Sequence, residues 1–137
     1  MALEVKSPIV GDRIWALPIG GAPVKFLQYL VFRSEDGGAL PSQRQMAVEY
    51  GVKPPTISAL MEPLFELNLV LRPKAEERGG NTYRLHPLAR KYGSMEEMEA
   101  AFRQAFTDMR AGKLPSLNLP DNQVAPPAEG ERNLRIA

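Results

Sequence analysis

The fold is set by the stretch QRQMAVEYGVKPPTISALM, residues 43–61. Two short helices can cross closely only where a small residue lies at their contact, a glycine permits the turn, and apolar residues of the second helix point inward. Four residues meet these demands, at positions five, nine, fifteen and eighteen of the stretch: Ala47, Gly51, Ile57 and Leu60. The spacing predicts a helix-turn-helix over residues 42–62.

The residues around the two helices mark their ends. Ser42 is a suitable N-cap, because its hydroxyl can accept a hydrogen bond from an amide of the first turn. Gly51 tolerates the left-handed backbone that ends a helix sharply. The pair Pro54–Pro55 fits a first turn, where amides have no intrahelical partner. We therefore expect one helix over 43–50 and a second over about 54–67.

A helix is also predicted before this pair. Apolar residues recur there at spacings of three and four, beginning near Pro23 and ending near Ser34: Val24, Leu27, Leu30 and Val31. Further upstream, the apolar run 14–17 lies between Gly11 and a Pro/Gly-rich cluster. We interpret it as a short strand within an N-terminal lead-in, residues 1–20.

A β-hairpin is predicted after the pair. The β-prone residues 69–71 precede the polar, glycine-containing stretch PKAEERGGN, and Tyr83 and Leu85 alternate with polar neighbours after it. Residues 88–92 are long enough for one helical turn before the next helix.

Ser94 followed by Glu97 fits a capping box that opens a final helix over about 95–110. This helix carries an apolar stripe at spacings of three and four: Met95, Met98, Phe102, Ala105, Phe106 and Met109. The stripe favours a homodimer, with packing onto its own domain as the alternative. Beyond residue 111 the chain is rich in proline and poor in large apolar groups, so we expect 112–137 to be a flexible tail that could contact another protein.

These elements predict a mainly α chain with a small β-hairpin, an α+β fold. Its parts are the lead-in 1–20, a domain over 21–93, a helix over 94–111 and a tail over 112–137. The composition of the 137-residue chain agrees, since 44% hydrophobic residues suffice for one core.

Composition also limits the chemistry. The chain has no cysteine and one histidine, and it shows no glycine-rich phosphate loop. We therefore expect no enzyme, no metal and no cofactor. His86 is expected to have a structural hydrogen-bonding role, and Trp15 to be a core or interface anchor.

No apolar run is long enough for a membrane span, so we expect a cytoplasmic protein. The net charge of +1 is unevenly distributed, because residues 1–93 carry twelve Lys/Arg and nine Asp/Glu and are therefore mildly basic.

Three segments, GALPSQRQMAVEYGV, TIS and LNLVLR, resemble the GntR-type regulators, and MarR-type domains share the same plan. PVKFLQYLV and NTYRLHPLAR are similar to segments of RepL-type plasmid replication initiators. The resemblance covers roughly residues 21–90. It implies a winged helix-turn-helix that binds double-stranded DNA, with the second helix of the pair in the major groove and the hairpin wing in the minor groove.

The resemblance also implies which residues would contact DNA: Gln43, Arg44, Lys53, Pro55, Thr56, Ser58, Ala59, Arg72, Lys74, Arg78, Asn81 and Arg84. Arg78 stands beside two glycines at the hairpin tip, where it suits the narrow minor groove. The sequence departs from the families at Lys53, Pro54 and Pro55, where they usually carry Ser or Arg. We expect phosphate and thymine-methyl contacts to outweigh bidentate hydrogen bonds.

Three functions follow as hypotheses. The first is a nucleoid-associated transcriptional regulator without catalytic activity. The second is a replication or partition protein of a plasmid or mobile element. The third is an adaptor that binds protein and not DNA, which is favoured by the carboxylates in and around the motif: Glu49, Glu62, Glu66, Glu76 and Glu77.

Overall fold

The computed structural model describes residues 4–72 and 83–119. The main regular elements of this part are α-helices: α1 (Gly21–Arg33), α2 (Gln43–Tyr50), α3 (Pro54–Glu66) and α4 (Met95–Arg110). Two small antiparallel sheets pair β1 (Val5–Lys6) with β4 (Lys91–Tyr92) and β2 (Val70–Leu71) with β3 (Arg84–Leu85). Single 3-10 turns are η1 (Ile14–Ala16), η2 (Asp36–Gly38) and η4 (Pro87–Ala89). The α+β prediction is confirmed.

The ends of α2, α3 and α4 lie where local capping predicts them. The Ser42 hydroxyl accepts the amide of Gln45 at 3.1 Å, and the Ser94 hydroxyl accepts the amide of Glu97 at 3.1 Å. Gly51 ends α2 with φ 76° and ψ 32°, in the left-handed region that favours glycine. A Cβ at this position would meet no atom within 4 Å, so the glycine is required by backbone conformation and not by space.

The N-terminal strand is not where we predicted it. Residues 14–16 form the turn η1, and the strand is β1, in which Val5 lies opposite Tyr92 of β4. The predicted helical turn over 88–92 is likewise η4 followed by a strand. An apolar run shows that a segment is near a core, but strand pairing depends on a partner that is distant in sequence. Trp15 is 76% exposed and is therefore not a core residue.

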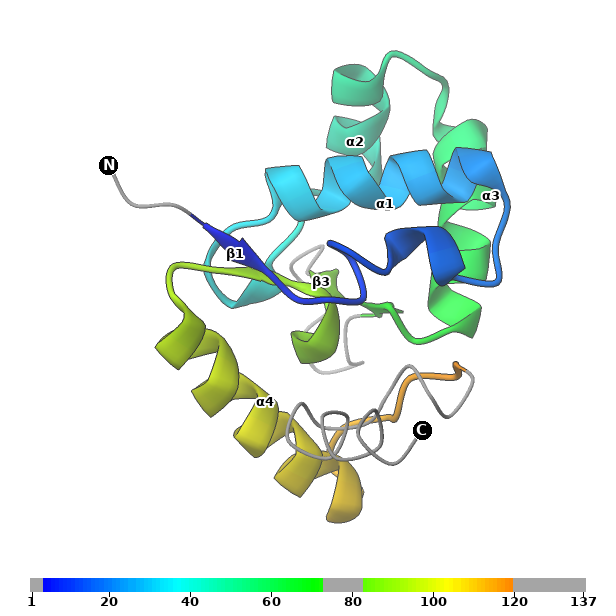
Figure 1. Ribbon diagram of the computed structural model, residues 1–137. Helices are drawn as coiled ribbons and strands as arrows, with labels where there is room; N and C mark the ends of the chain where they lie inside the picture. Colours follow the sequence, from blue (N-terminus) through cyan, green and yellow to red (C-terminus); the bar gives the residue numbers. More distant parts are fainter. Residues whose placement is uncertain (1–3, 73–82, 120–137) are drawn as a thin grey trace.

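One hydrophobic core contains residues from all four α-helices. Its fully buried centre comes from α1, α2, α3 and the strands that follow: Phe26, Leu27, Leu30, Met46, Ile57, Met61, Leu64, Leu69 and Leu85. Ile9, Val10 and Leu17 of the lead-in belong to the same cluster. Figure 1 shows α1, α2 and α3 together on one side, and α4 on the other side of the small strands. No helix in this part of the chain has the length and apolar character needed to cross a membrane.

The apolar stripe of α4 packs on its own domain. Met98, Phe102 and Ala105 are buried in the shared core. The opposite face of the helix is exposed and polar: Glu96, Glu99, Arg103, Gln104 and Thr107. Met95 is 52% exposed, and Phe106 and Met109 are partly buried. The alternative of packing within the chain thus accounts for three of the six residues proposed for dimerisation, and the dimer itself stays a prediction.

Residues 112–119, here called the C-terminal strap, lie against the domain. The Asn118 amide donates to the carbonyl of Leu67 at 3.0 Å, and the Asn68 side-chain amide donates to the carbonyl of Ser116 at 2.8 Å. Leu117 is buried in the core. The prediction of a flexible tail is therefore wrong for 112–119, because burial of the apolar Leu117 side chain holds this segment against the domain. Residues 120–137 lie outside the described part of the chain.

His86 connects the hairpin to the strap. Its ring is fully buried, its Nδ1 accepts the Leu88 amide at 3.1 Å, and its Nε2 lies 2.7 Å from the carbonyl of Pro115. Because Nδ1 accepts, the proton of the neutral ring is on Nε2, which donates to Pro115. Burial lowers the pKa of His86 to about 4, although the Pro115 carbonyl favours the charged form. The predicted structural role of His86 is confirmed.

Replacing Leu117 with alanine should lower the free energy of unfolding by about 2–4 kcal/mol, because it empties a buried site in the shared core. Urea denaturation at neutral pH measures the change. Leu119→Ala is the matched control, since Leu119 is only partly buried and should lose less. Equal losses in the two variants would contradict the anchoring role of Leu117.

His86 should also make the protein less stable in acid. Its folded pKa of about 4 lies below the ordinary value of 6.5, so its contribution is complete above pH 6.5 and is lost as the pH falls through 4. The shift corresponds to about 3 kcal/mol. In His86→Gln, which retains a donor and an acceptor but does not titrate, urea denaturation between pH 7 and pH 4 should show a flatter profile. Identical profiles for the two proteins would refute the assignment.

Candidate nucleic-acid interface

The pair α2 and α3 forms the framework of the candidate interface. Ala47 is buried at the crossing, and its carbonyl accepts the amides of both Gly51 and Val52 at 3.0 Å. Ile57 of α3 is fully buried and Leu60 partly so. Ala47, Ile57 and Leu60 are therefore buried or partly buried as the sequence predicts, and Gly51 lies in the turn between α2 and α3.

The outer face of α3 is exposed along most of its length: Pro54, Pro55, Thr56, Ser58, Ala59 and Glu62. Its first turn has few free amides, because the two prolines have none and the Thr56 amide bonds to the carbonyl of Lys53 at 2.9 Å. A ligand at this end of α3 would meet side chains and proline rings. The helix terminus itself contributes little hydrogen bonding.

The start of α2 differs in this respect. The amides of Gln43 and Arg44 make no hydrogen bond to any residue of the described ranges, while the next amide is capped by Ser42. Free amides at a helix N-terminus attract anions. Arg44 is exposed beside them. The beginning of α2 is therefore the better anion-binding end of the pair.

Ser58 and Gln43, predicted separately as contact residues, touch each other. The Ser58 hydroxyl donates to the Gln43 side-chain carbonyl at 3.1 Å, across the junction between the two helices. This bond holds Gln43 beside the exposed face of α3. A separation of fifteen residues gives no sequence signal for such a contact.

Four of the predicted cations lie in the described ranges, and all are exposed: Arg44, Lys53, Arg72 and Arg84. Arg72 follows β2, and its guanidinium carbon lies 3.9 Å from the ring centroid of Phe65 on α3. Arg84 is in β3, opposite Leu71. The predicted hairpin-tip residues Lys74, Arg78 and Asn81 lie outside the described residues. The base of the hairpin thus places Arg72 beside α3, whereas the Arg84 guanidinium lies near Gly37 of η2.

Sequence reasoning missed a cluster around Glu49, which joins α1 to α2. The Glu49 carboxylate accepts the Tyr29 hydroxyl at 2.5 Å, Arg33 Nε at 2.9 Å and Gln45 Nε2 at 3.0 Å. Arg33 also pairs with Glu35 at 3.3 Å. The local signals for the cluster were two spacings of four, between Gln45 and Glu49 on α2 and between Tyr29 and Arg33 on α1.

Hydrogen bonds from Tyr29, Arg33 and Gln45 lower the pKa of Glu49 to about 2. Burial and the Glu49 carboxylate raise the pKa of Tyr29. Glu49 is therefore ionised and already occupied by partners within the chain. It does not supply a free negative charge at the α2–α3 surface.

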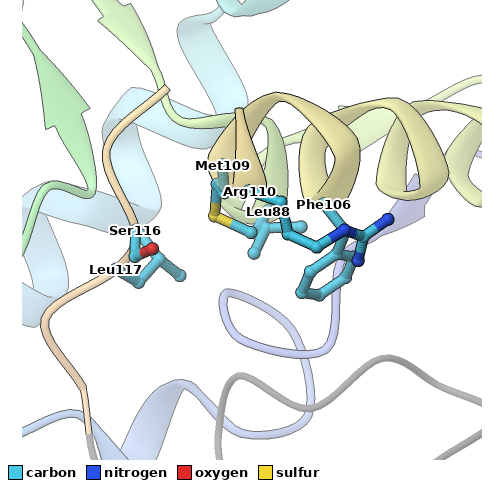
Figure 2. Close-up of a pocket in the computed structure, with 6 residues that line it drawn as sticks. All are labelled: Leu88, Phe106, Met109, Arg110, Ser116 and Leu117. Carbon is cyan, nitrogen blue, oxygen red and sulfur yellow. The ribbon is translucent and has the colours of Figure 1, made fainter. Parts of the chain in front are cut away.

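A small hollow lies away from this surface. It has a volume of about 230 Å³ and is lined by η4, α4 and the C-terminal strap: Leu88, Phe106, Met109, Arg110, Ser116 and Leu117. Figure 2 shows side chains of the strap facing those of α4 and η4 across it. None of the lining residues belongs to α2 or α3. Among the described residues, no cluster of His, Asp or Glu is suited to hold a metal ion.

Comparison with known proteins adds no relative. No family description, no curated protein and no solved structure matches this chain.

Because Glu49 is ionised and bound by three side chains, we expect its substitution to cause a pH-dependent loss of thermal stability. Glu49→Gln removes the charge that Arg33 and Tyr29 bind, so the midpoint of thermal unfolding should fall at pH 7. The folded pKa is depressed, so the wild-type advantage is complete above pH 4.5 and shrinks as the pH falls towards 2.

The control for this measurement is Glu99→Gln on α4, since Glu99 is exposed and makes no ion pair with a described residue. Calorimetry of the three proteins between pH 7 and pH 3 checks the prediction. A Glu49→Gln deficit that stays constant over this range would mean that the charge of Glu49 does not matter.

Proposed function

We propose that the protein is a sequence-specific, double-stranded-DNA-binding transcriptional regulator with a winged helix-turn-helix fold. In this proposal α3 enters the major groove, the start of α2 binds the phosphate backbone, and the hairpin between β2 and β3 is the wing in the minor groove. No catalytic step is part of the proposal.

The order of the elements supports the winged-helix assignment. Between α1 and α2, Ala39 forms a bridge to Arg84 of β3, and the Leu40 amide donates to the carbonyl of Tyr83 at 2.9 Å. This contact adds a short third strand position beside β3. The resulting order of α1, a strand position, α2, α3 and a hairpin is the order expected of a winged helix, which supports the proposal. The sequence alone did not suggest the contact at Ala39.

The observation that carries the proposal is the exposed face of α3 with cations around it. Thr56, Ser58 and Ala59 are exposed there, and three exposed cations lie on α2, at the N-cap of α3 and beside Phe65 of α3: Arg44, Lys53 and Arg72. Hydroxyl groups can hydrogen-bond to bases or phosphates, and methyl groups and proline rings can contact a thymine methyl. Cations at the edges supply the phosphate contacts that dominate affinity.

A protein-binding adaptor is the second candidate, and exposed apolar side chains favour it. Trp15 and Phe32 are each 76% exposed, and Val48 on α2 is 72% exposed. None of them belongs to α3. They fit a protein contact made in addition to DNA binding or in place of it.

Selection of bound fragments from the native genome tests the proposal. Recovery of promoter fragments supports a regulator. Recovery of iterated origin repeats alone would instead favour replication or partition, and absence of binding at low salt would favour the adaptor.

Individual cations should change the salt dependence of binding. Arg44→Gln and Lys53→Gln should each weaken binding to any duplex and reduce the slope of log K against log salt by about 1, because each removes one phosphate contact. Fluorescence anisotropy at several salt concentrations measures the slope. Arg103→Gln on the outer face of α4 is the control with the same charge change. Slopes reduced equally in all three variants would show that only net charge matters.

A further inference from the structure

Arg72 is held in place by aromatic packing. Its guanidinium lies over the Phe65 ring at 3.9 Å, and Phe65 in turn packs against Tyr83 with ring centroids 5.8 Å apart. A guanidinium on an aromatic face is positioned without using its N–H groups. The stack therefore fixes Arg72 between α3 and the base of the hairpin and leaves its donors available.

Glu62 is the charged partner of Arg72. Its Oε1 lies 3.9 Å from Arg72 Nη2, which is an ion-pair distance and too long for a hydrogen bond. Both side chains are more than 60% exposed, at 61% and 62%. Arg72 makes no hydrogen bond to any other residue of the described ranges. The pair is thus loose and accessible to an external anion.

The position of Glu62 makes this pair relevant to DNA. Glu62 lies one helical turn after Ser58 and Ala59 on the outer face of α3, so it would stand in or beside the groove. A carboxylate there can hold Arg72 away from a phosphate, and it can also accept a hydrogen bond from the amino group of cytosine. Glu62 therefore has one possible partner in the free protein, Arg72, and another in a specific complex, the base edge.

We propose that Glu62 is a selectivity residue that competes with DNA phosphate for Arg72. On arbitrary duplex, Arg72 stays with Glu62 and is withheld from the backbone phosphates. On a cognate site, α3 seats in the groove, Glu62 turns to the base edges, and Arg72 passes to a phosphate. This inference rests on the proposed function and adds a device that limits non-specific binding.

The expected size of the effect on affinity follows from the exposure of Glu62 and Arg72. An exposed ion pair is weak, so Glu62 restrains Arg72 only modestly, and a well-placed phosphate can replace it. Freeing Arg72 from Glu62 adds one cation to the interface, so it should raise affinity for arbitrary duplex about fivefold at low salt, with less effect at high salt. The effect should be specific to Glu62, because Glu66, also exposed on α3, makes no ion pair with a described residue.

The test uses the full chain and two duplexes: the best site from an in vitro selection with the wild-type protein, and a scrambled duplex of the same composition. Anisotropy titrations at about 50 mM salt compare wild type, Glu62→Gln, Glu66→Gln, Arg72→Gln and the double variant Glu62→Gln/Arg72→Gln. All of the substituted side chains are exposed, and circular dichroism checks that each variant is folded.

Glu62→Gln should bind the scrambled duplex about fivefold more tightly and gain nothing on the selected site, so discrimination falls by the same factor. Glu66→Gln should change both affinities equally and less than about twofold. In the Arg72→Gln background, the effect of Glu62→Gln should shrink to that of Glu66→Gln.

Equal effects of Glu62→Gln and Glu66→Gln, or an effect of Glu62→Gln that persists without Arg72, would overturn the competition. A wild-type protein that binds neither duplex would instead overturn the proposed function, and the inference with it. The two failures are distinct, because the first occurs in a protein that binds DNA.

Discussion

The left-handed backbone at Gly51 is the constraint on which the arrangement of the other elements depends. It ends α2 after eight residues and lets the amides of Gly51 and Val52 both return to the Ala47 carbonyl. The crossing that results buries Ala47 and Ile57 together and turns the opposite side of α3 to solvent. An L side chain here would strain the backbone without meeting any neighbour. The exposed face of α3 is thus a consequence of one dihedral angle.

Carboxylates on the two helices have different partners, and this decides what their charges can do. Glu49 is bound by three side chains from α1 and α2, so its charge stabilises the helix pair. Among the described residues, Glu62 has one partner, Arg72 at 3.9 Å, and both side chains are exposed. The sequence presents the two residues as equal evidence against DNA binding. Their contacts separate them, because only a carboxylate without close partners projects its field into solvent.

Local signals predicted the helices, and distant contacts were missed. Ser42, Gly51 and Ser94 act on their own turns, so their sequence context suffices to place α2, α3 and α4. The pairing of β1 with β4, the bridge at Ala39 and the hydrogen bond from Ser58 to Gln43 join residues whose separation carries no pattern. The candidate interface was therefore predicted as a face of α3, but its internal contacts were not.

The apolar stripe of α4 and Leu117 of the strap also show what the sequence does not specify, which is the surface that covers an apolar side chain. Spacings of three and four indicate that α4 packs one face against an apolar surface. They do not indicate whether that surface belongs to a second copy or to the same chain. Here the shared core covers Met98, Phe102 and Ala105, while the outer face of α4 is polar. On α4, the large apolar side chains with exposed surface are Met95, Phe106 and Met109. A dimer of the proposed regulator would therefore need apolar surface from other elements as well.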